Sequence, residues 1–452
     1  MSKFDKERLN PEIFQIDEKR MREGWYADKY FDNNRFILEA LAKEGYTYTG
    51  NPDMQFEGVD LSTFEVGNGI VEMQVFTRRK PFSVIAGVDE ALAILEKCTG
   101  YYDEEGNFIN TYDQLEIEAV EDGTFAYYDG EVKNVQPVLK IRGRYRDFAV
   151  LETNYLGVLA EATRVATNVY NVLVAAMEKK VLFFPARFAH WKLQGVHGYA
   201  YSIAVDAFKE RYGREAGKFV STLGQGEWWG GEGGGTLPHA LISMFFGDLS
   251  EAMYQYCRLM PVEVPRIALV DYHNNCVSDT QKLMKRLFDE HWKLYKEGKK
   301  EEAKKFRLDG VRPDTSGTMV DKSIRPRTKE DFGVSPALVW NLRDAIDNFA
   351  DTKEVREDLS FDQTEALKEW LKGITITVTG GFNNEKIDLF KKMGVPCDTF
   401  GVGSSLLENC GNSGTNNDFT ADIVKIKVGD TWYNNSKIGR VACYNPNLKR
   451  IQ

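Results

Sequence analysis

Cysteine is scarce in this sequence, with six residues among 452, at positions 98, 257, 276, 397, 410 and 443. No two of them form a Cys-x-x-Cys pair, which argues against a structural zinc site and against a disulfide scaffold. Long apolar runs are missing too, since none approaches the ~18 residues that cross a bilayer. The first residues, MSKFDKERLNPEIF, carry charges from the third position and lack the apolar core of a signal peptide. We therefore expect a cytoplasmic protein with buried, reduced thiols.

Basic residues are fewer than acidic ones. The sequence has 58 Lys and Arg and 68 Asp and Glu, which gives a net charge of −10. An acidic chain is a poor general binder of nucleic acids, whose phosphates dominate such affinity. A local anion site stays possible, because helix N-termini and backbone N–H groups supply positive potential without net charge. The hydrophobic share of 42% and the charged share of 28% are those of an ordinary soluble globular protein.

The pattern of residues changes twice along the chain. Residues 1–45 are polar, and Asp28 is placed to cap a helix that ends near Gly45. Short β-branched and aromatic segments broken by Gly or Asp follow as far as residue 150, which indicates antiparallel strands and hairpins. A long amphipathic helix is expected over 154–179. We expect three segments: a β-rich N-terminal domain with an early helix (1–150), a catalytic domain (151–410) and a C-terminal segment that rejoins the N-terminal domain (411–452).

Strand and helix patterns alternate in the middle segment, from VLFFPAR through RIALVDYH, LDGVRPD and ITITVTGG to CDTFGVGSSL. Repeated strand–helix units imply parallel strands joined by right-handed crossovers. Their number favours a closed or nearly closed barrel over an open sheet. In such folds the loops that follow the carboxyl ends of the strands carry the functional site.

Two of these loops are rich in glycine. Gly380 and Gly381 follow one predicted strand, and Gly401 and Gly403 follow the next. Glycine allows the backbone to approach an anion, and the free N–H groups of such a loop point at it. Either pair alone is compatible with a tight turn, but two in succession predict a phosphate-binding cradle.

Further candidates lie after the other strands. Arg312 and Asp314 alternate at a strand end and so share a face. They suit either a clamp for a phosphate, with the carboxylate serving ribose or Mg²⁺, or a structural ion pair. Asp271 ends the strand RIALVD, at the position expected for an acidic site residue.

A glycine-rich stretch leads through Thr236 to His239, one of only five histidines, where a helix begins. This histidine suits a functional role or a helix cap. Phe184 and Arg187 follow another strand, and such a phenylalanine either stacks on a planar ring or belongs to the core. Trp228 and Trp229 beside Glu232 would suit a sugar site, but no pair of carboxylates indicates a glycosidase.

Taken in order, these motifs resemble the nicotinate phosphoribosyltransferase family. They are Phe-x-x-Arg, Gly-Thr-x-x-His, Val-Asp, Gly-Val-Arg-x-Asp-Thr, Thr-Gly-Gly and Gly-x-Gly, and the early stretch Tyr-Ala-Asp-Lys-Tyr-Phe at 26–31 resembles another family segment. The resemblance covers about residues 20–407. It implies an incomplete α/β, TIM-like barrel with a second, β-rich α+β domain built from N-terminal and C-terminal segments. It also implies a homodimer with shared active sites.

The resemblance further implies transfer of phosphoribose from phosphoribosyl pyrophosphate to nicotinate in NAD biosynthesis, with Mg²⁺ and with ATP as a co-substrate. No residue is assigned as a metal ligand of the protein's own. The implied roles are catalysis by His239, Arg312 and Asp314, with His239 as the phospho-acceptor, and substrate binding by Tyr30 of the partner subunit and by Phe184, Arg187, Thr236, Asp271, Gly380, Gly381, Gly401 and Gly403.

Some positions depart from the family pattern. Phe188 stands where many relatives have a second basic residue, Asn383 and Asn384 replace an acidic stretch, and Pro313 resembles the branch that uses nicotinamide. That branch has an acidic residue to bind the amide, and none occurs in the corresponding stretch 219–223. Nicotinate is therefore the predicted base, with nicotinamide as the alternative. A non-catalytic sugar-phosphate sensor on the same barrel is the other alternative.

Overall fold

The computed structural model describes residues 1–409 and 418–452. The expected C-terminal segment begins at 411, so its first residues and Cys410 lie outside the described part. Contacts divide the chain into two units: Met1–Tyr170, Gly195–Tyr212 and Glu408–Gln452 form the first, and Asn171–Gln194 and Gly213–Leu407 form the second. The division falls within the long helix α4 (Glu152–Ala176), and not at residue 150.

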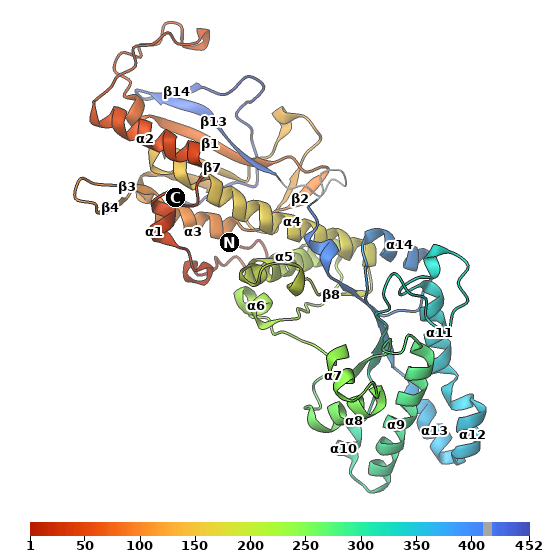
Figure 1. Ribbon diagram of the computed structural model, residues 1–452. Coiled ribbons are helices and arrows are strands. Elements are labelled where there is room, and N and C mark those ends of the chain that lie inside the picture. Colours follow the sequence, from red (N-terminus) through yellow and green to blue (C-terminus); the bar gives the residue numbers. More distant parts are fainter. Residues whose placement is uncertain (410–417) are drawn as a thin grey trace. The chain divides into compact units, whose positions relative to one another are not determined.

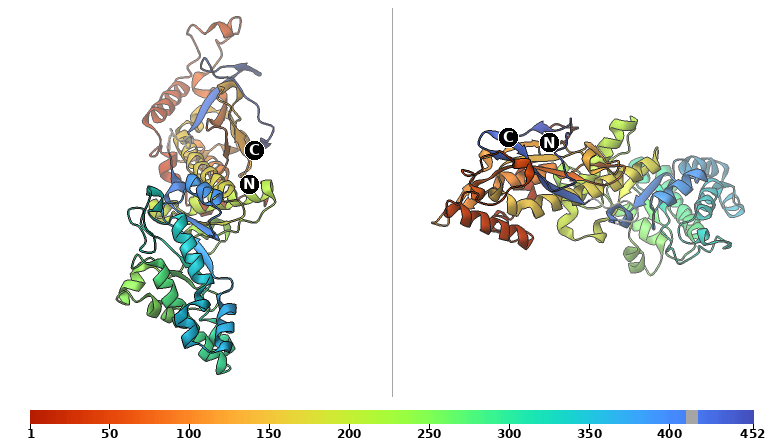
Figure 2. Two further views of the ribbon diagram at one scale, coloured as in Figure 1. Left: turned by 90° about the vertical axis from the view of Figure 1, so that its right-hand side faces the viewer. Right: turned by 90° about the horizontal axis from the view of Figure 1, so that it is seen from above.

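The first unit is built on a six-stranded antiparallel sheet in the order β14-β13-β1-β7-β5-β15. Its C-terminal strand β13 pairs with β1 along the whole length of β1, from Ile70↔Lys427 to Thr77↔Phe419. Figures 1 and 2 show these blue C-terminal strands beside the orange N-terminal ones. The strands of this sheet are β1 (Ile70–Thr77), β5 (Glu116–Ala119), β7 (Leu139–Arg144), β13 (Phe419–Val428), β14 (Thr431–Asn434) and β15 (Lys449–Arg450).

One face of this sheet forms the core of the unit and the other is polar. Alternate residues of β1 and β7, among them Val71, Met73 and Ile141, pack against helices α3 (Val88–Cys98) and α4. Helix α3 interrupts a stretch for which only strands and hairpins were expected. The remaining elements of the unit are α1 (Glu18–Arg22), α2 (Lys29–Lys43), β2 (Phe82–Val84), β3 (Gly100–Tyr102), β4 (Phe108–Asn110), β6 (Phe125–Tyr127) and α5 (Gln194–Tyr212).

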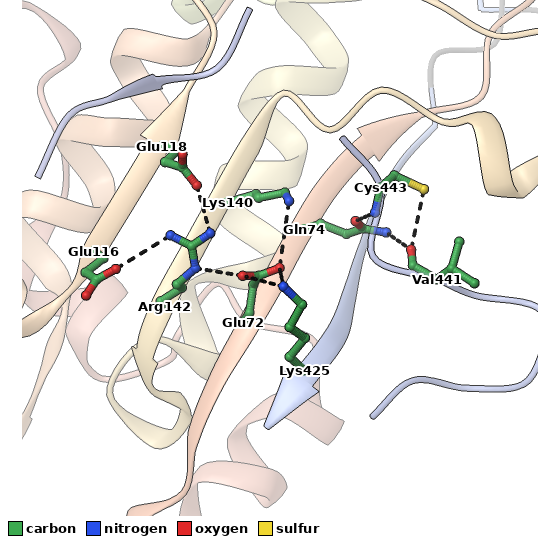
Figure 3. A network of polar contacts seen from close by, with 9 residues as sticks. All are labelled: Glu72, Gln74, Glu116, Glu118, Lys140, Arg142, Lys425, Val441 and Cys443. Atoms are coloured by element: carbon green, nitrogen blue, oxygen red, sulfur yellow. Dashed lines mark hydrogen bonds and ion pairs between the residues drawn. The ribbon is translucent and has the colours of Figure 1, made fainter. Parts of the chain in front are cut away.

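The polar face is held together by Glu72, which is buried in the middle of β1 (Figure 3). Arg142 donates to Glu72 at 2.7 Å, and the ammonium groups of Lys140 and Lys425 lie 3.7 and 3.3 Å from its carboxylate. Burial alone would raise the pKa of Glu72, but the hydrogen bond from Arg142 and the two lysine charges outweigh it, so the pKa falls below its ordinary value. The C-terminal strand is thus tied to the sheet by charge as well as by its ladder.

The second unit contains a parallel sheet in the order β8-β12-β11-β10-β9. Val220 extends it by a parallel bridge to Phe183, at the end of β8, and Gly233 adds a further bridge to Val220. Its strands are β8 (Lys180–Phe183), β9 (Ile267–Leu269), β10 (Gly310–Arg312), β11 (Thr375–Val378) and β12 (Thr399–Val402). Its helices are α6 (Leu223–Gly226), α7 (His239–Met244), α8 (Leu249–Leu259), α9 (Cys276–Lys296), α10 (Lys300–Lys304), α11 (Pro336–Asp347), α12 (Lys353–Asp358), α13 (Phe361–Leu371) and α14 (Asn384–Lys392).

A hydrogen bond joins the segments that follow the two ends of this sheet. His239, six residues beyond Gly233, hydrogen-bonds Asp271, two residues beyond β9, at 2.9 Å. Within residues 1–409 and 418–452, no backbone ladder joins the two ends of the sheet. The expected mixed α/β architecture is confirmed, and the closed or nearly closed barrel stays a prediction.

The described cysteines are all buried and unbridged: Cys98, Cys257, Cys276, Cys397 and Cys443. Burial raises the pKa of the Cys257 thiol to about 12, so this sulfur stays protonated at neutral pH. Across the described residues no helix combines the length and apolar character needed to cross a membrane.

Candidate active site

The predicted site residues of the second unit gather at one edge of its sheet. Because the strands are parallel, their carboxyl ends meet at a single edge. The residues that follow β8, β9, β10, β11 and β12 therefore face a common space, and the bridge at Gly233 brings the Thr236–His239 segment to the same edge. The predicted residues at this edge are Phe184, Arg187, Thr236, His239, Asp271, Arg312, Asp314, Gly380, Gly381, Gly401 and Gly403.

The side chain of Arg312, the last residue of β10, has no hydrogen-bond or ion-pair partner among the described residues. Its Nε is buried and donates to no acceptor, and none of the ion pairs of the described residues includes its guanidinium. Burial lowers the pKa of Arg312, Asp314 and Asp271 oppose that shift, and the charge of Arg187 adds to it. A buried, unsatisfied guanidinium is costly unless it serves a ligand. The structural Arg312–Asp314 ion pair that the sequence left open is therefore not formed.

Asp314 is bound to the neighbouring strand instead. Its Oδ1 accepts a 2.7 Å hydrogen bond from the hydroxyl of Thr379, the residue before the double glycine. This bond fixes one oxygen of Asp314 and leaves the other for a ligand. Thr379 itself was not singled out from the sequence, and its place in the Thr-Gly-Gly motif was the only available signal.

His239 and Asp271 form the second polar contact of the site. His239 begins α7, with its side chain 44% exposed, and its Nε2 lies 2.9 Å from Oδ1 of Asp271, whose side chain is 9% exposed. Burial raises the pKa of Asp271, as does the charge of Asp314, while His239 lowers it by its charge and its hydrogen bond. Tyr272 lies beside His239, with ring centroids 6.4 Å apart. The hydrogen bond with Asp271 thus orients the partly exposed imidazole of His239 at the carboxyl edge of the sheet.

Two of the predicted glycines serve close packing. A Cβ at Gly401 would stand 2.5 Å from Cγ2 of Thr379 and 2.8 Å from the ring of Phe184, and one at Gly403 would stand 2.7 Å from the ring of Phe188. These positions admit no larger residue while the aromatic rings stay in place. Gly401 of β12 thus makes room for the ring of Phe184, which is half-buried and also contacts Phe219 edge-on.

The other two glycines shape a loop. Gly380 and Gly381 have φ values of 92° and 68°, in the region that favours glycine. In the described part of the chain, no acceptor is found for the amides of Gly380, Gly381 and Phe382. Successive amides freed by left-handed backbone make a concavity suited to an anion. This is the geometry expected of a phosphate-binding loop.

Thr236 and Arg187 lie at the rim with open hydrogen-bonding capacity. The Oγ1 of Thr236 is buried and has no partner among the described residues. Arg187 is exposed and its guanidinium lies 5.5 Å from the ring centroid of Phe188.

Tyr30 belongs to the first unit, on α2, with its side chain 63% exposed. The part that Tyr30 would play in a partner subunit's site stays a prediction.

The carboxylates do not form a metal centre of the protein's own. Among residues 1–409 and 418–452 no group of three or more His, Cys, Asp or Glu could hold a metal ion. Mg²⁺ is commonly held by one or two carboxylates together with substrate phosphates. Asp271 and Asp314 therefore suit an ion that arrives with a phosphorylated substrate.

Two comparisons relate this chain to known proteins. Residues 53–163 match the family model described as quinolinate phosphoribosyl transferase, N-terminal domain. The whole chain resembles the crystal structure of nicotinate-nucleotide pyrophosphorylase from Pyrococcus furiosus, with 23% identity and a TM-score of 0.61, over 94% of this chain and 80% of that one. The domain match confirms the resemblance to a phosphoribosyltransferase family that the motifs indicated, and the structural match shows a shared fold.

Two further solved structures match with lower TM-scores. Human nicotinic acid phosphoribosyltransferase matches at 14% identity with a TM-score of 0.49, covering 79% of this chain and 71% of that chain. Nicotinate-nucleotide pyrophosphorylase from Ehrlichia chaffeensis matches at 13% identity with a TM-score of 0.45, covering 86% and 97%. None of the curated proteins searched matches this chain.

Proposed function

We propose that this protein transfers the phosphoribosyl group of phosphoribosyl pyrophosphate to nicotinate, giving nicotinate mononucleotide and pyrophosphate, with assistance from ATP and Mg²⁺. The observation that carries the proposal is the guanidinium of Arg312, whose buried Nε has no acceptor among the described residues and which interacts with the charges of Asp271 and Asp314. The phosphates of phosphoribosyl pyrophosphate suit the guanidinium, and its ribose hydroxyls or an accompanying Mg²⁺ suit the two carboxylates.

The chemistry needs little more than placement and charge. Breaking the bond at the anomeric carbon leaves positive charge on the ribose and negative charge on the pyrophosphate. Arg312 and Arg187 would stabilise the pyrophosphate, and Asp314, fixed by Thr379, would orient the ribose. Bound Mg²⁺ neutralises charge on the leaving group. No side-chain nucleophile is required at the anomeric carbon.

Base recognition is assigned to the stretch beside Phe184. Ser221 and Thr222 are the polar residues there, and both are engaged, Ser221 with Oε1 of Gln225 at 3.1 Å and Thr222 with Gln194 at 2.9 Å. The Nε2 of buried Gln225 has no acceptor among the described residues. No carboxylate occurs in residues 219–225. An anionic base would therefore find a hydrogen-bond donor here and no negative charge to repel it.

We expect nicotinate to be preferred over nicotinamide by at least ~10-fold in kcat/KM, about 1.4 kcal/mol of discrimination. The measurement offers purified protein phosphoribosyl pyrophosphate, Mg²⁺ and, in separate reactions, nicotinate, nicotinamide or quinolinate, and quantifies each mononucleotide. Equal or faster use of nicotinamide would replace the proposed base by the neutral amide. Product from none of the three would favour a sugar-phosphate sensor.

Subunit mixing tests the expected sharing of sites. Tyr30→Ala should weaken base binding by roughly 2- to 10-fold, the scale of one lost aromatic contact. If Tyr30 serves the partner's site, an exchanged mixture of Tyr30→Ala and Arg312→Ala has one intact site per heterodimer. Its activity should then exceed the mean of the two variants by roughly 1.5- to 5-fold. Activity equal to that mean, after exchange has been verified by mass, would indicate that Tyr30 and Arg312 of one chain serve the same site and that sites are built within one chain.

A further inference from the structure

Lys386 is a charged residue beside the glycine loop that the motif resemblance does not assign. It is the third residue of α14, and its backbone N–H donates to the side chain of the capping residue Asn383 at 3.0 Å. Long side chains of a helix lean toward its N-terminus. Its Nζ accordingly lies 3.1 Å from the carbonyl oxygen of Gly380 and 4.3 Å from the ring centroid of Phe382.

The ammonium group of Lys386 lacks a counter-ion. It is half-buried, and none of the ion pairs of the described residues includes it. An ammonium has three donors, and one is used by Gly380. Burial alone lowers the pKa of Lys386 to about 8, since no neighbouring charge contributes to the shift. A cation kept in such surroundings is stabilised by an anion that brings its own charge.

The loop beside this ammonium offers the rest of an anion site. The amides of Gly380, Gly381 and Phe382 have no acceptor among the described residues. A Cβ at Gly381 would meet nothing within 4 Å, so the space next to this residue is open. Ser405, after β12, donates to the carbonyl of Phe382 at 2.8 Å and ties the second glycine loop to the first.

We propose that Lys386 is a substrate-binding residue, whose ammonium contacts the 5′-phosphate of phosphoribosyl pyrophosphate while one of its N–H groups holds Gly380 in place. This inference rests on the proposed function for the identity of the sugar phosphate. The bond to the Gly380 carbonyl turns that oxygen toward Lys386 and leaves the loop amides for the anion. The 5′-phosphate is remote from the reacting carbon, so Lys386 contributes to binding of the sugar phosphate and not to base choice.

The test measures binding of ribose 5-phosphate by calorimetry and steady-state kinetics with both substrates. Lys386→Met should weaken ribose 5-phosphate binding by roughly tenfold to hundredfold, the scale of one charge-assisted contact. It should raise KM for phosphoribosyl pyrophosphate by a similar factor and leave KM for nicotinate within about twofold. Lys392→Met, an exposed lysine of the same helix, is the matched control and should bind as the wild type does.

The Lys386→Arg variant tests whether Lys386 binds the phosphate or only holds the Gly380 loop in place. It keeps a cation and stays protonated at all working pH values. Wild-type binding should weaken as pH rises through about 8, where the free ammonium loses its proton, while Lys386→Arg should bind without this loss. Affinity of Lys386→Met within twofold of the wild type, or the same pH profile in Lys386→Arg, would overturn the inference. So would a wild type that does not bind ribose 5-phosphate.

The two proposals fail in different ways. Binding of ribose 5-phosphate that depends on Lys386, with no pyridine turned over, would support the role of Lys386 and refute the proposed reaction. Turnover of nicotinate that is unchanged in Lys386→Met would support the reaction and refute the role of this lysine. If Lys386→Met does not fold, the pH comparison between the wild type and Lys386→Arg decides alone.

Discussion

Replacing Arg312 by alanine should lower kcat/KM by roughly 10²- to 10³-fold, the loss expected when one preorganised charge-stabilising group is removed. Arg312 is half-buried, and its buried Nε has no acceptor among the described residues. The guanidinium therefore does not have to leave a protein partner before it binds the leaving pyrophosphate. Its contacts form with the substrate and strengthen as charge develops on the pyrophosphate.

The Arg312→Lys variant sharpens this test. A lysine is a point charge and does not replace a planar fork that makes two parallel hydrogen bonds, so we expect recovery of no more than about tenfold. Thermal unfolding provides the control, because the absence of an Arg312–Asp314 ion pair predicts little change in Tm. Normal kinetics with a reduced Tm would make Arg312 a structural residue and refute its assignment to the leaving group.

The position of the site was predictable from the sequence to a useful degree, and its contacts were not. Alternating strand and helix patterns placed Asp271, Arg312 and Gly380 after successive parallel strands, and parallel strands share one edge. The sequence did not show that Asp271 pairs with His239, because this contact depends on the path of the chain between Gly233 and His239. It also left open a structural pair of Arg312 with Asp314, whereas in the structure Asp314 accepts a hydrogen bond from Thr379.

Other differences have local causes. Helix α3 is short and lies between strand segments in the sequence. The sequence pattern therefore predicted β structure throughout residues 46–150. Helix α4 runs without interruption through the division between the two units, so no change in composition marks that boundary. Lys386 is one lysine among many in the sequence, and only the path of its side chain back to Gly380 distinguishes it.

The expected stimulation by ATP should depend on His239. A carboxylate only accepts hydrogen bonds, so the contact with Asp271 at 2.9 Å places the proton of the imidazole on Nε2 and leaves the lone pair on Nδ1. We predict that Nδ1 attacks the γ-phosphorus of ATP. A nitrogen–phosphorus bond forms, the bond to the bridging oxygen breaks, and ADP leaves. The carboxylate of Asp271 stabilises the positive charge that develops on the ring.

His239→Asn should therefore retain slow synthesis without ATP and lose all stimulation by ATP, while the wild type gains an acid-labile, base-stable phosphate. Asp271→Asn keeps a hydrogen-bond acceptor without the charge and should slow phosphorylation by roughly 10- to 100-fold. Mass spectrometry at neutral pH and a coupled ADP assay measure both effects. A wild type with neither protein-bound phosphate nor a response to ATP would reduce His239 to a helix-capping or substrate-binding residue. Phosphoribosyl transfer through Arg312 would stand unaffected, because its contacts do not involve the imidazole.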